Sequence, residues 1–152
     1  MIDYKQTSNG VDIFHNDKLI IRHQKRKPAF YVGSGNETIE SYRGNFKIED
    51  FIEERIGLNS YQIKDNEITF SHCDLKLEVT LEEKDNRLHI KLNLNEEYNR
   101  FWMRVYATKE EKVYGCGEQA SYFNLRGRNF PLWTSEPGVG RDKNSLTTFY
   151  AD

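Results

Sequence analysis

The sequence lacks long apolar runs, an excess of charge of either sign, and frequent cysteine or proline. Its longest apolar runs are only a few residues, whereas a helix that spans a bilayer needs about 20. The formal net charge of −2 gives no electrostatic basis for binding nucleic acid or a membrane surface. Residues 1–10 also lack the basic and then apolar pattern of a signal peptide. We therefore expect a cytoplasmic protein with neither a membrane nor a nucleic-acid partner.

Cysteine and histidine are too sparse and too scattered to indicate a metal centre. Cys73 and Cys116 are the only cysteines, and in a reducing compartment we expect both to be free thiols. The histidines are His15, His23, His72 and His89. None has the spacing to a second ligand that zinc sites show, and the adjacent His72 and Cys73 would point to opposite faces of a strand. The sequence predicts no metal and no cofactor.

Alternation of apolar and polar residues is abundant, and it indicates strands with one buried and one solvated face. A chain of 152 residues, 37 % of them hydrophobic, is long enough to bury a core as one domain. Strands are predicted at residues 11–15, 18–22, 29–32, 45–48, 61–64, 67–72, 75–82, 88–94 and 101–107. Many short strands without a βαβ rhythm predict an all-β fold, an antiparallel β-sandwich or barrel.

Turn signals separate these strands. The strongest is Asn9-Gly10, which suits a two-residue hairpin turn with positive φ at both central positions. Asn16-Asp17 and residues 84–86 predict further turns.

One stretch carries a helical signal. Asp50 with Glu53 three residues later resembles a capping box, and Gly57 is placed to end the turn of helix that would follow. Residues 33–36, which contain two glycines, are expected to close the strand at 29–32. The prediction therefore allows at most one or two short helical turns in an otherwise all-β chain.

A basic run occupies residues 22–27, just before Pro28. It has two interpretations: a phosphate-binding patch, or the solvated end of a strand. The second is favoured, because no other basic cluster in the chain supports the first.

Residues 115–141 differ in composition from the rest of the chain. They contain five of its ten glycines, two of its three prolines and one of its two tryptophans. Such a stretch, rich also in Tyr and Phe, is typical of an ordered loop that carries binding residues rather than of a flexible linker.

Several site chemistries can be tested against this loop. Residues 115–120 fit a G-x-G-x-x-A dinucleotide motif, but no hydrophobic strand precedes them and no amphipathic helix follows, so we reject that interpretation. Glu118 and Glu136 could form the carboxylate pair of a glycosidase, although solvated glutamates are commoner. Arg126 and Arg128 are interpreted as structural rather than as substrate ligands. Trp133, close to Glu136, offers an indole and a carboxylate to a sugar, or alternatively a buried core ring.

Residues 113–143, the signature segment, read VYGCGEQASYFNLRGRNFPLWTSEPGVGRDK. They resemble the end of the N-terminal β-sandwich of glycoside hydrolase family 31, in its bacterial α-glucosidase and sulfoquinovosidase branch, where a YGCGEQ…LRG…PLWTSEQGVGR pattern occurs. Pro137 departs from that pattern, which has Gln at this position. The preceding strands agree with the family in style only.

The resemblance implies that residues 1–152 are a galactose-mutarotase-like β-sandwich that precedes a catalytic (β/α)₈ barrel. Members of the family are retaining α-glycosidases, whose two catalytic carboxyl groups lie about 5–5.5 Å apart. Those are aspartates of the barrel, so the resemblance implies no catalytic residue in this chain. It assigns to Glu136 the acidic residue of a loop at the substrate pocket, with Trp133 and Arg141 beside it. The implied partners are an α-glucoside or sulfoquinovoside and the protein's own barrel.

Two other functions use the same aromatic residues. A free-standing carbohydrate-binding module would stack sugars on Trp133, Tyr122 and Phe123. An oligomerisation surface would bury them against a second copy. Residues 146–152 read as the interior of a strand, which favours a chain that continues into a barrel.

Overall fold

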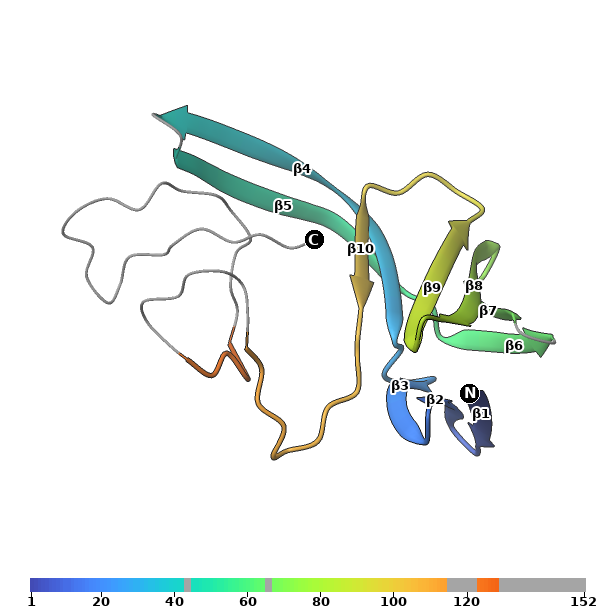
Figure 1. The fold of residues 1–152 in the computed structure, drawn as a ribbon. Helices are drawn as coiled ribbons and strands as arrows, with labels where there is room; N and C mark the ends of the chain where they lie inside the picture. The colour runs from blue at the N-terminus through green and yellow to red at the C-terminus, as the bar shows by residue number, and fades with distance from the viewer. Residues whose placement is uncertain (43–44, 65–66, 115–122, 129–152) are drawn as a thin grey trace. The chain divides into compact units, whose positions relative to one another are not determined.

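The computed structural model describes residues 1–42, 45–64, 67–114 and 123–128, and within these ranges every helix or strand assigned is a β-strand. In chain order they are β1 (Ile2–Thr7), β2 (Gly10–His15), β3 (Lys18–Gln24), β4 (Phe30–Tyr42), β5 (Asn45–Gly57), β6 (Ser60–Lys64), β7 (Glu67–His72), β8 (Leu75–Lys84), β9 (Arg87–Leu94) and β10 (Arg100–Met103) (Figure 1). Among the described residues β1 with β2, β2 with β3, β4 with β10, and the successive strands from β6 to β9 pair in antiparallel fashion, so the predicted all-β antiparallel fold is confirmed.

The chain forms two compact units. The first unit comprises Met1–Gly35 and Ile52–Ala107, and the second comprises Asn36–Phe51 and the chain from Thr108 onward. Within the described residues the strands form three sheets, with the orders β1-β2-β3, β10-β4-β5 and β6-β7-β8-β9. The long strands β4 and β5 pass from one unit to the other.

The first unit has one hydrophobic core to which all three sheets contribute. Its buried members are Val11, Ile13, Ile21, Ala29, Phe30, Val32, Leu58, Ile68, Phe70, Leu75, Leu77, Val79 and Leu81. In β8 the buried residues recur at every second position, as the alternation in the sequence predicts. Burial of apolar area at about 25 cal/mol per Å² is the main force that holds the sheets together.

Two of the predicted turns are confirmed. Asn16 and Asp17 have φ of 49° and 63°, and Asp85 and Asn86 have φ of 53° and 59°. Positive φ at both central residues matches the twist of the flanking strands, which is why Asn and Asp are favoured there.

The first predicted turn is displaced by one residue. The hairpin turns at Ser8-Asn9, and Gly10 is the first residue of β2, where it pairs with Thr7. Gly10 serves packing rather than turn geometry, because a Cβ at this position would lie 1.9 Å from the backbone oxygen of His23.

The predictions for residues 33–36 and 50–57 were wrong. β4 continues through Gly33 to Tyr42, and the stretch with the capping-box sequence is the second half of β5. A Cβ on Gly33 would lie 2.0 Å from the backbone oxygen of Glu54, so the glycine permits close approach of two strands instead of ending one. Because an isolated helix this short is marginal, pairing with β4 outweighs the local capping signal.

The predicted strand at 101–107 is β10, which ends at Met103. Backbone hydrogen bonds continue beyond it, from the Arg104 amide to Ala29 and from the Tyr106 amide to Ile20, at 2.8 and 2.7 Å. These two bonds hold the chain beyond β10 to the first unit, whose last residue is Ala107.

His23 is a polar residue within the hydrophobic core. It is fully buried, its Nδ1 accepts a hydrogen bond from the Ala29 amide at 3.3 Å, and its ring lies 4.7 Å from that of Phe70. Among the described residues Nε2 has no partner of good geometry. Burial lowers the pKa of His23 to about 4, and the Asn59 backbone offsets part of that shift. His23 is therefore neutral in the folded protein.

This burial predicts acid lability. The unfolded chain binds a proton at His23 below about pH 6.5, whereas the folded protein does so only near pH 4. Stability is therefore fully present above pH 6.5 and falls as the pH drops from 6.5 to 4, by up to about 3 kcal/mol from this residue. We expect His23→Asn, whose Oδ1 can replace Nδ1 as the acceptor, to be less stable at pH 7 but to lose less on acidification.

Urea unfolding at several pH values measures this dependence. The exposed His89 provides the control. His89→Asn should keep the wild-type dependence of the free energy of unfolding on pH. If the free energy of unfolding of His23→Asn depends on pH as in the wild type, His23 is not the cause of the acid lability.

Candidate functional site

Glu136, Trp133 and Arg141, the predicted substrate-binding residues, lie outside the described residues, as do Glu118, Tyr122 and Cys116. Of the signature segment the structure describes residues 113–114 and 123–128, on either side of residues 115–122. Together with Glu111, these residues form what we call the neck.

A side-chain amide closes the neck. Oδ1 of Asn124 accepts hydrogen bonds from the amides of Val113 at 3.1 Å and Arg126 at 3.2 Å. The Leu125 amide donates to the Val113 carbonyl at 2.8 Å. Val113 is thereby fastened to Asn124 and Leu125, which follow it in the described part of the chain.

A tight turn and an arginine strengthen this closure. The Arg128 amide donates to the Leu125 carbonyl at 3.2 Å, and Gly127 has a φ of +71°, as position three of a type II turn requires. Nη1 of Arg126 donates to the Glu111 carbonyl at 2.9 Å. The structural interpretation of Arg126 agrees with this contact, because the guanidinium spans the neck instead of standing free.

The neck also presents an exposed aromatic pair. The rings of Tyr114 and Phe123 lie 4.8 Å apart at 51°, and their exposed fractions are 52 % and 86 %. An exposed ring of this kind is unusual on a soluble surface and is suited to contact with a ligand or with another protein surface.

The residues of the basic run at 22–27 have different structural roles. Arg22 binds Asp12, its cross-strand neighbour, through Nε at 2.9 Å and Nη2 at 2.7 Å, and lies 4.9 Å from the centre of the Tyr106 ring. His23 is in the core. Gln24, Lys25 and Arg26 line surface cavities, and only the last two of these are basic, so the run is not a continuous phosphate patch.

The sheet β10-β4-β5 carries an aromatic cluster around Arg55 on one face. On one face the Arg55 guanidinium lies 4.5 Å from the centre of the Tyr31 ring and 4.7 Å from that of Trp102. Both contacts are cation–π interactions that fix the three side chains against one another. The Trp102 indole thus already has a partner in this chain, which makes it a poor platform for a sugar.

Sequence analysis missed one feature, a surface groove beside β6. It is lined by Gln6, Lys25, Ser60, Tyr61, Gln62 and Ile63. These residues come from three separate stretches of the chain, and no local motif joins them.

Among the described residues, no group of three or more His, Cys, Asp and Glu side chains is placed to hold a metal ion, and Cys73 is an exposed free cysteine. The same part of the chain contains no helix long and apolar enough to cross a membrane.

The closure of the neck by Asn124 is testable. Asn124→Ala removes the acceptor of two amides, so we expect the amides of Val113 and Arg126 to exchange hydrogen about threefold to tenfold faster. Asn124→Asp keeps the Oδ1 acceptor and should restore slow exchange. Hydrogen exchange followed by NMR measures both amides, and equal rates in wild type and Asn124→Ala would contradict this role.

Comparison with known proteins covers nearly the whole chain. Residues 2–147 match the glycosyl hydrolase 31 N-terminal galactose mutarotase-like domain. The chain is 44 % identical over 152 residues to a sulfoquinovosidase of Agrobacterium fabrum (strain C58) and 40 % identical over 156 residues to one of Escherichia coli (strain K12). Each alignment covers 98 % of this chain but only 22 % and 23 % of the relatives, so the chain spans about a fifth of their length.

A solved structure agrees. A family 31 sulfoquinovosidase from E. rectale, in complex with the aza-sugar inhibitor IFGSQ, matches with a TM-score of 0.72 at 43 % identity. The match covers 95 % of this chain and 22 % of that one. The resemblance predicted from the signature segment is thus confirmed over residues 2–147, and the chain belongs to the N-terminal galactose mutarotase-like domains of glycosyl hydrolase family 31.

Proposed function

We propose that this chain is the N-terminal accessory domain of a retaining α-glycosidase that hydrolyses sulfoquinovosides. The observation that carries the proposal is the alignment of 98 % of the chain with two sulfoquinovosidases at 40 % and 44 % identity. The catalytic carboxyl groups belong to the downstream barrel, and this domain packs on that barrel and contributes a loop to the substrate pocket.

An apolar surface of the first unit supports the packing role. Phe101, Met103 and Val105, the apolar row, are exposed by 43 %, 39 % and 60 %. Phe101 pairs with Val32 and Met103 pairs with Phe30, both buried core residues. Since directly opposed residues of paired strands share a face, the core of the first unit reaches the surface along β10. A row of this kind needs a cover, and the remainder of the enzyme provides it.

The loop role rests on Glu136, Trp133 and Arg141. A carboxylate accepts hydrogen bonds from sugar hydroxyl groups, an indole stacks on the apolar face of a sugar ring, and a guanidinium donates to hydroxyl or anionic oxygens. The neck supports this role in part, because it fixes the chain up to Arg128, just before these residues, and an anchored start lowers the entropic cost of holding such groups against a pocket.

The loop assignment predicts a kinetic effect of Glu136→Ala in the full-length enzyme. Loss of a charge-assisted hydrogen bond of about 1.5–3 kcal/mol should lower kcat/KM by about 10- to 100-fold, mainly through KM, with little change in Tm. Glu136→Gln retains one acceptor oxygen and should lose less. Hydrolysis of a chromogenic sulfoquinovoside measures the effect, and an unchanged kcat/KM in Glu136→Ala would refute the assignment.

The packing assignment is tested by a charge placed in the apolar row. In the full-length enzyme a covered Met103→Asp should cost about 2–4 kcal/mol, since a carboxylate would be buried without a partner. Leu92→Asp is the matched control, because Leu92 lies on β9 with a similar exposed fraction of 42 %. Thermal unfolding compares the two variants, and equal losses would count against a barrel-covered row.

The proposed function also predicts different activities for the isolated chain and for the full-length enzyme. The 152-residue chain alone should not hydrolyse a sulfoquinovoside, whereas the full-length protein should. Turnover by the isolated chain that a point mutation within it abolishes would overturn the accessory role.

A carbohydrate-binding module is the second candidate, favoured by the exposed Phe123 ring. It requires saturable glycan binding by the chain without a barrel, and loss of that binding in Trp133→Ala. An absence of binding up to millimolar glycan would remove it.

A further inference from the structure

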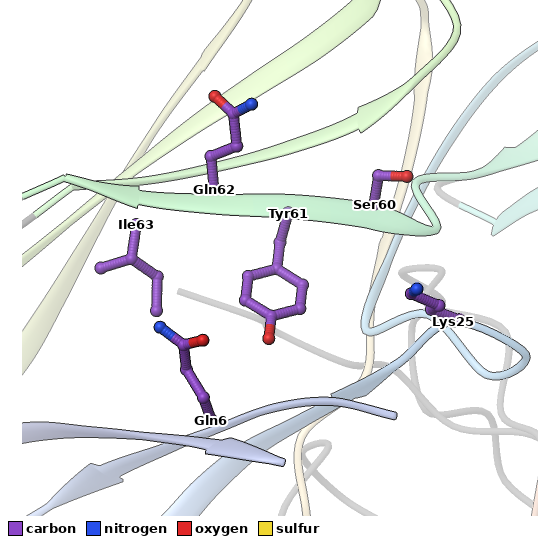
Figure 2. A pocket seen from close by; sticks show the side chains of 6 residues that line it. All are labelled: Gln6, Lys25, Ser60, Tyr61, Gln62 and Ile63. Atoms are coloured by element: carbon purple, nitrogen blue, oxygen red, sulfur yellow. The ribbon is translucent and has the colours of Figure 1, made fainter. Parts of the chain in front are cut away.

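The groove beside β6 lies between strands of different sheets of the first unit. Figure 2 shows Tyr61 and Ile63 extending from β6 toward Gln6 of β1, while Ser60 and Gln62 extend from the opposite side of β6. Lys25, from the turn after β3, lies at one end. The groove has a volume of about 600 Å³.

A second depression adjoins the first through Lys25. It has a volume of about 330 Å³ and is lined by Asn9, Gln24, Lys25 and Arg26. Lys25 lines both depressions, and we call the two together the polar groove. A surface of this size accommodates a small saccharide.

The polar groove contains cations and uncharged polar groups, and no acidic residue is among its described lining residues. Lys25 and Arg26 supply the charge, and carboxamide or hydroxyl groups supply both donors and acceptors. The carboxamide and hydroxyl residues of the lining are Gln6, Asn9, Gln24, Ser60, Tyr61 and Gln62. Tyr61 and Ile63 provide partly buried apolar surface on the side that faces β1.

The polar side chains of the groove, Tyr61 apart, have no hydrogen bond or ion pair to other described residues. Their hydrogen-bonding capacity is therefore available to a ligand. Arg22, three positions before Lys25, shows the contrast, because its guanidinium is held by Asp12.

The backbone that carries these side chains is fixed. The Lys25 amide donates to the Asn9 carbonyl at 3.0 Å, and Gln24 and Lys27 exchange backbone hydrogen bonds at 3.3 and 2.9 Å across the Lys25-Arg26 turn. The Tyr61 hydroxyl donates to the Gly10 carbonyl at 2.9 Å, which ties β6 to the first sheet. The backbone of the groove is therefore formed before a ligand binds, which lowers part of the entropic cost of binding.

We propose that the polar groove binds an anionic saccharide, a sugar that carries a sulfonate, sulfate or carboxylate group. Lys25 and Arg26 bind the acidic group, Gln6, Asn9 and Gln24 bind hydroxyl groups, and the exposed apolar surface of Tyr61 and Ile63 contacts the sugar ring. This binding goes beyond the proposed function and does not depend on the glycosidase activity.

Calorimetry on the full-length protein tests the proposal, with glucose 6-sulfate as the probe and glucose and inorganic sulfate as comparisons. We expect a Kd of about 1 mM for glucose 6-sulfate and a loss of about five- to tenfold in Lys25→Gln, since one charge-assisted contact is removed. Lys27→Gln is the matched control: it changes the net charge equally, and Lys27 lines neither depression. Arg26→Gln is the second groove variant and guards against misfolding of the first.

Only heat that Lys25→Gln removes and Lys27→Gln retains is assigned to the groove, which separates it from any other sugar site in the enzyme. Absence of such heat up to about 20 mM probe, roughly 20 times the expected Kd, overturns the proposal. Equal Lys25-dependent binding of sulfate alone overturns the saccharide part, and equal binding of glucose overturns the role of the charge. Hydrolysis of a sulfoquinovoside by the same preparation is scored separately, so either proposal can fail without the other.

Discussion

Three buried rings, one from each sheet, meet at the centre of the first unit. Phe70 of the four-stranded sheet lies 4.7 Å from His23 of β3 on one side and 4.7 Å from Phe30 of β4 on the other. This stack of rings, tilted by 48° at each contact, joins three sheets whose strands do not pair with one another among the described residues. Its stability depends on a neutral His23, because a proton would place an unpaired charge where three apolar surfaces meet. The rest of the core is arranged around this contact.

The strands around these rings also carry the functional features. β10 places Phe101 and Met103 beside the core and Trp102 on the opposite face against Arg55, so one strand both extends the hydrophobic core and closes an aromatic cluster. β6 uses the same alternation, with Tyr61 and Ile63 on the side that faces β1 and Gln62 on the other side (Figure 2). Period-two geometry thus lets single strands serve stability and recognition at once.

Features set by local sequence could be predicted, and features set by distant contacts could not. Alternation gave β8 and β9, and residues that tolerate positive φ gave the turns at Asn16-Asp17 and Asp85-Asn86. The prediction of a helix at 50–57 was wrong, because pairing with β4 makes this segment part of a strand. Gly10 and Gly33 were assigned to turns, whereas each is needed where a distant backbone oxygen approaches within 2.0 Å of the missing Cβ. Residue chemistry pointed to Trp133 and Glu136, the family resemblance gave their roles and added Arg141, and all three remain predictions.

The two candidate sugar-binding regions differ in how they are built, and this difference bears on their roles. The signature segment is continuous in sequence, is closed at its neck by Asn124, and belongs to the second unit. The polar groove is assembled from β1, the turn after β3 and β6, all in the first unit. Under the proposed function the signature segment acts as one loop against the barrel, so its chemistry requires the barrel. The polar groove is assembled from the framework of the first unit, so the ligand binding that we propose for it requires no second domain.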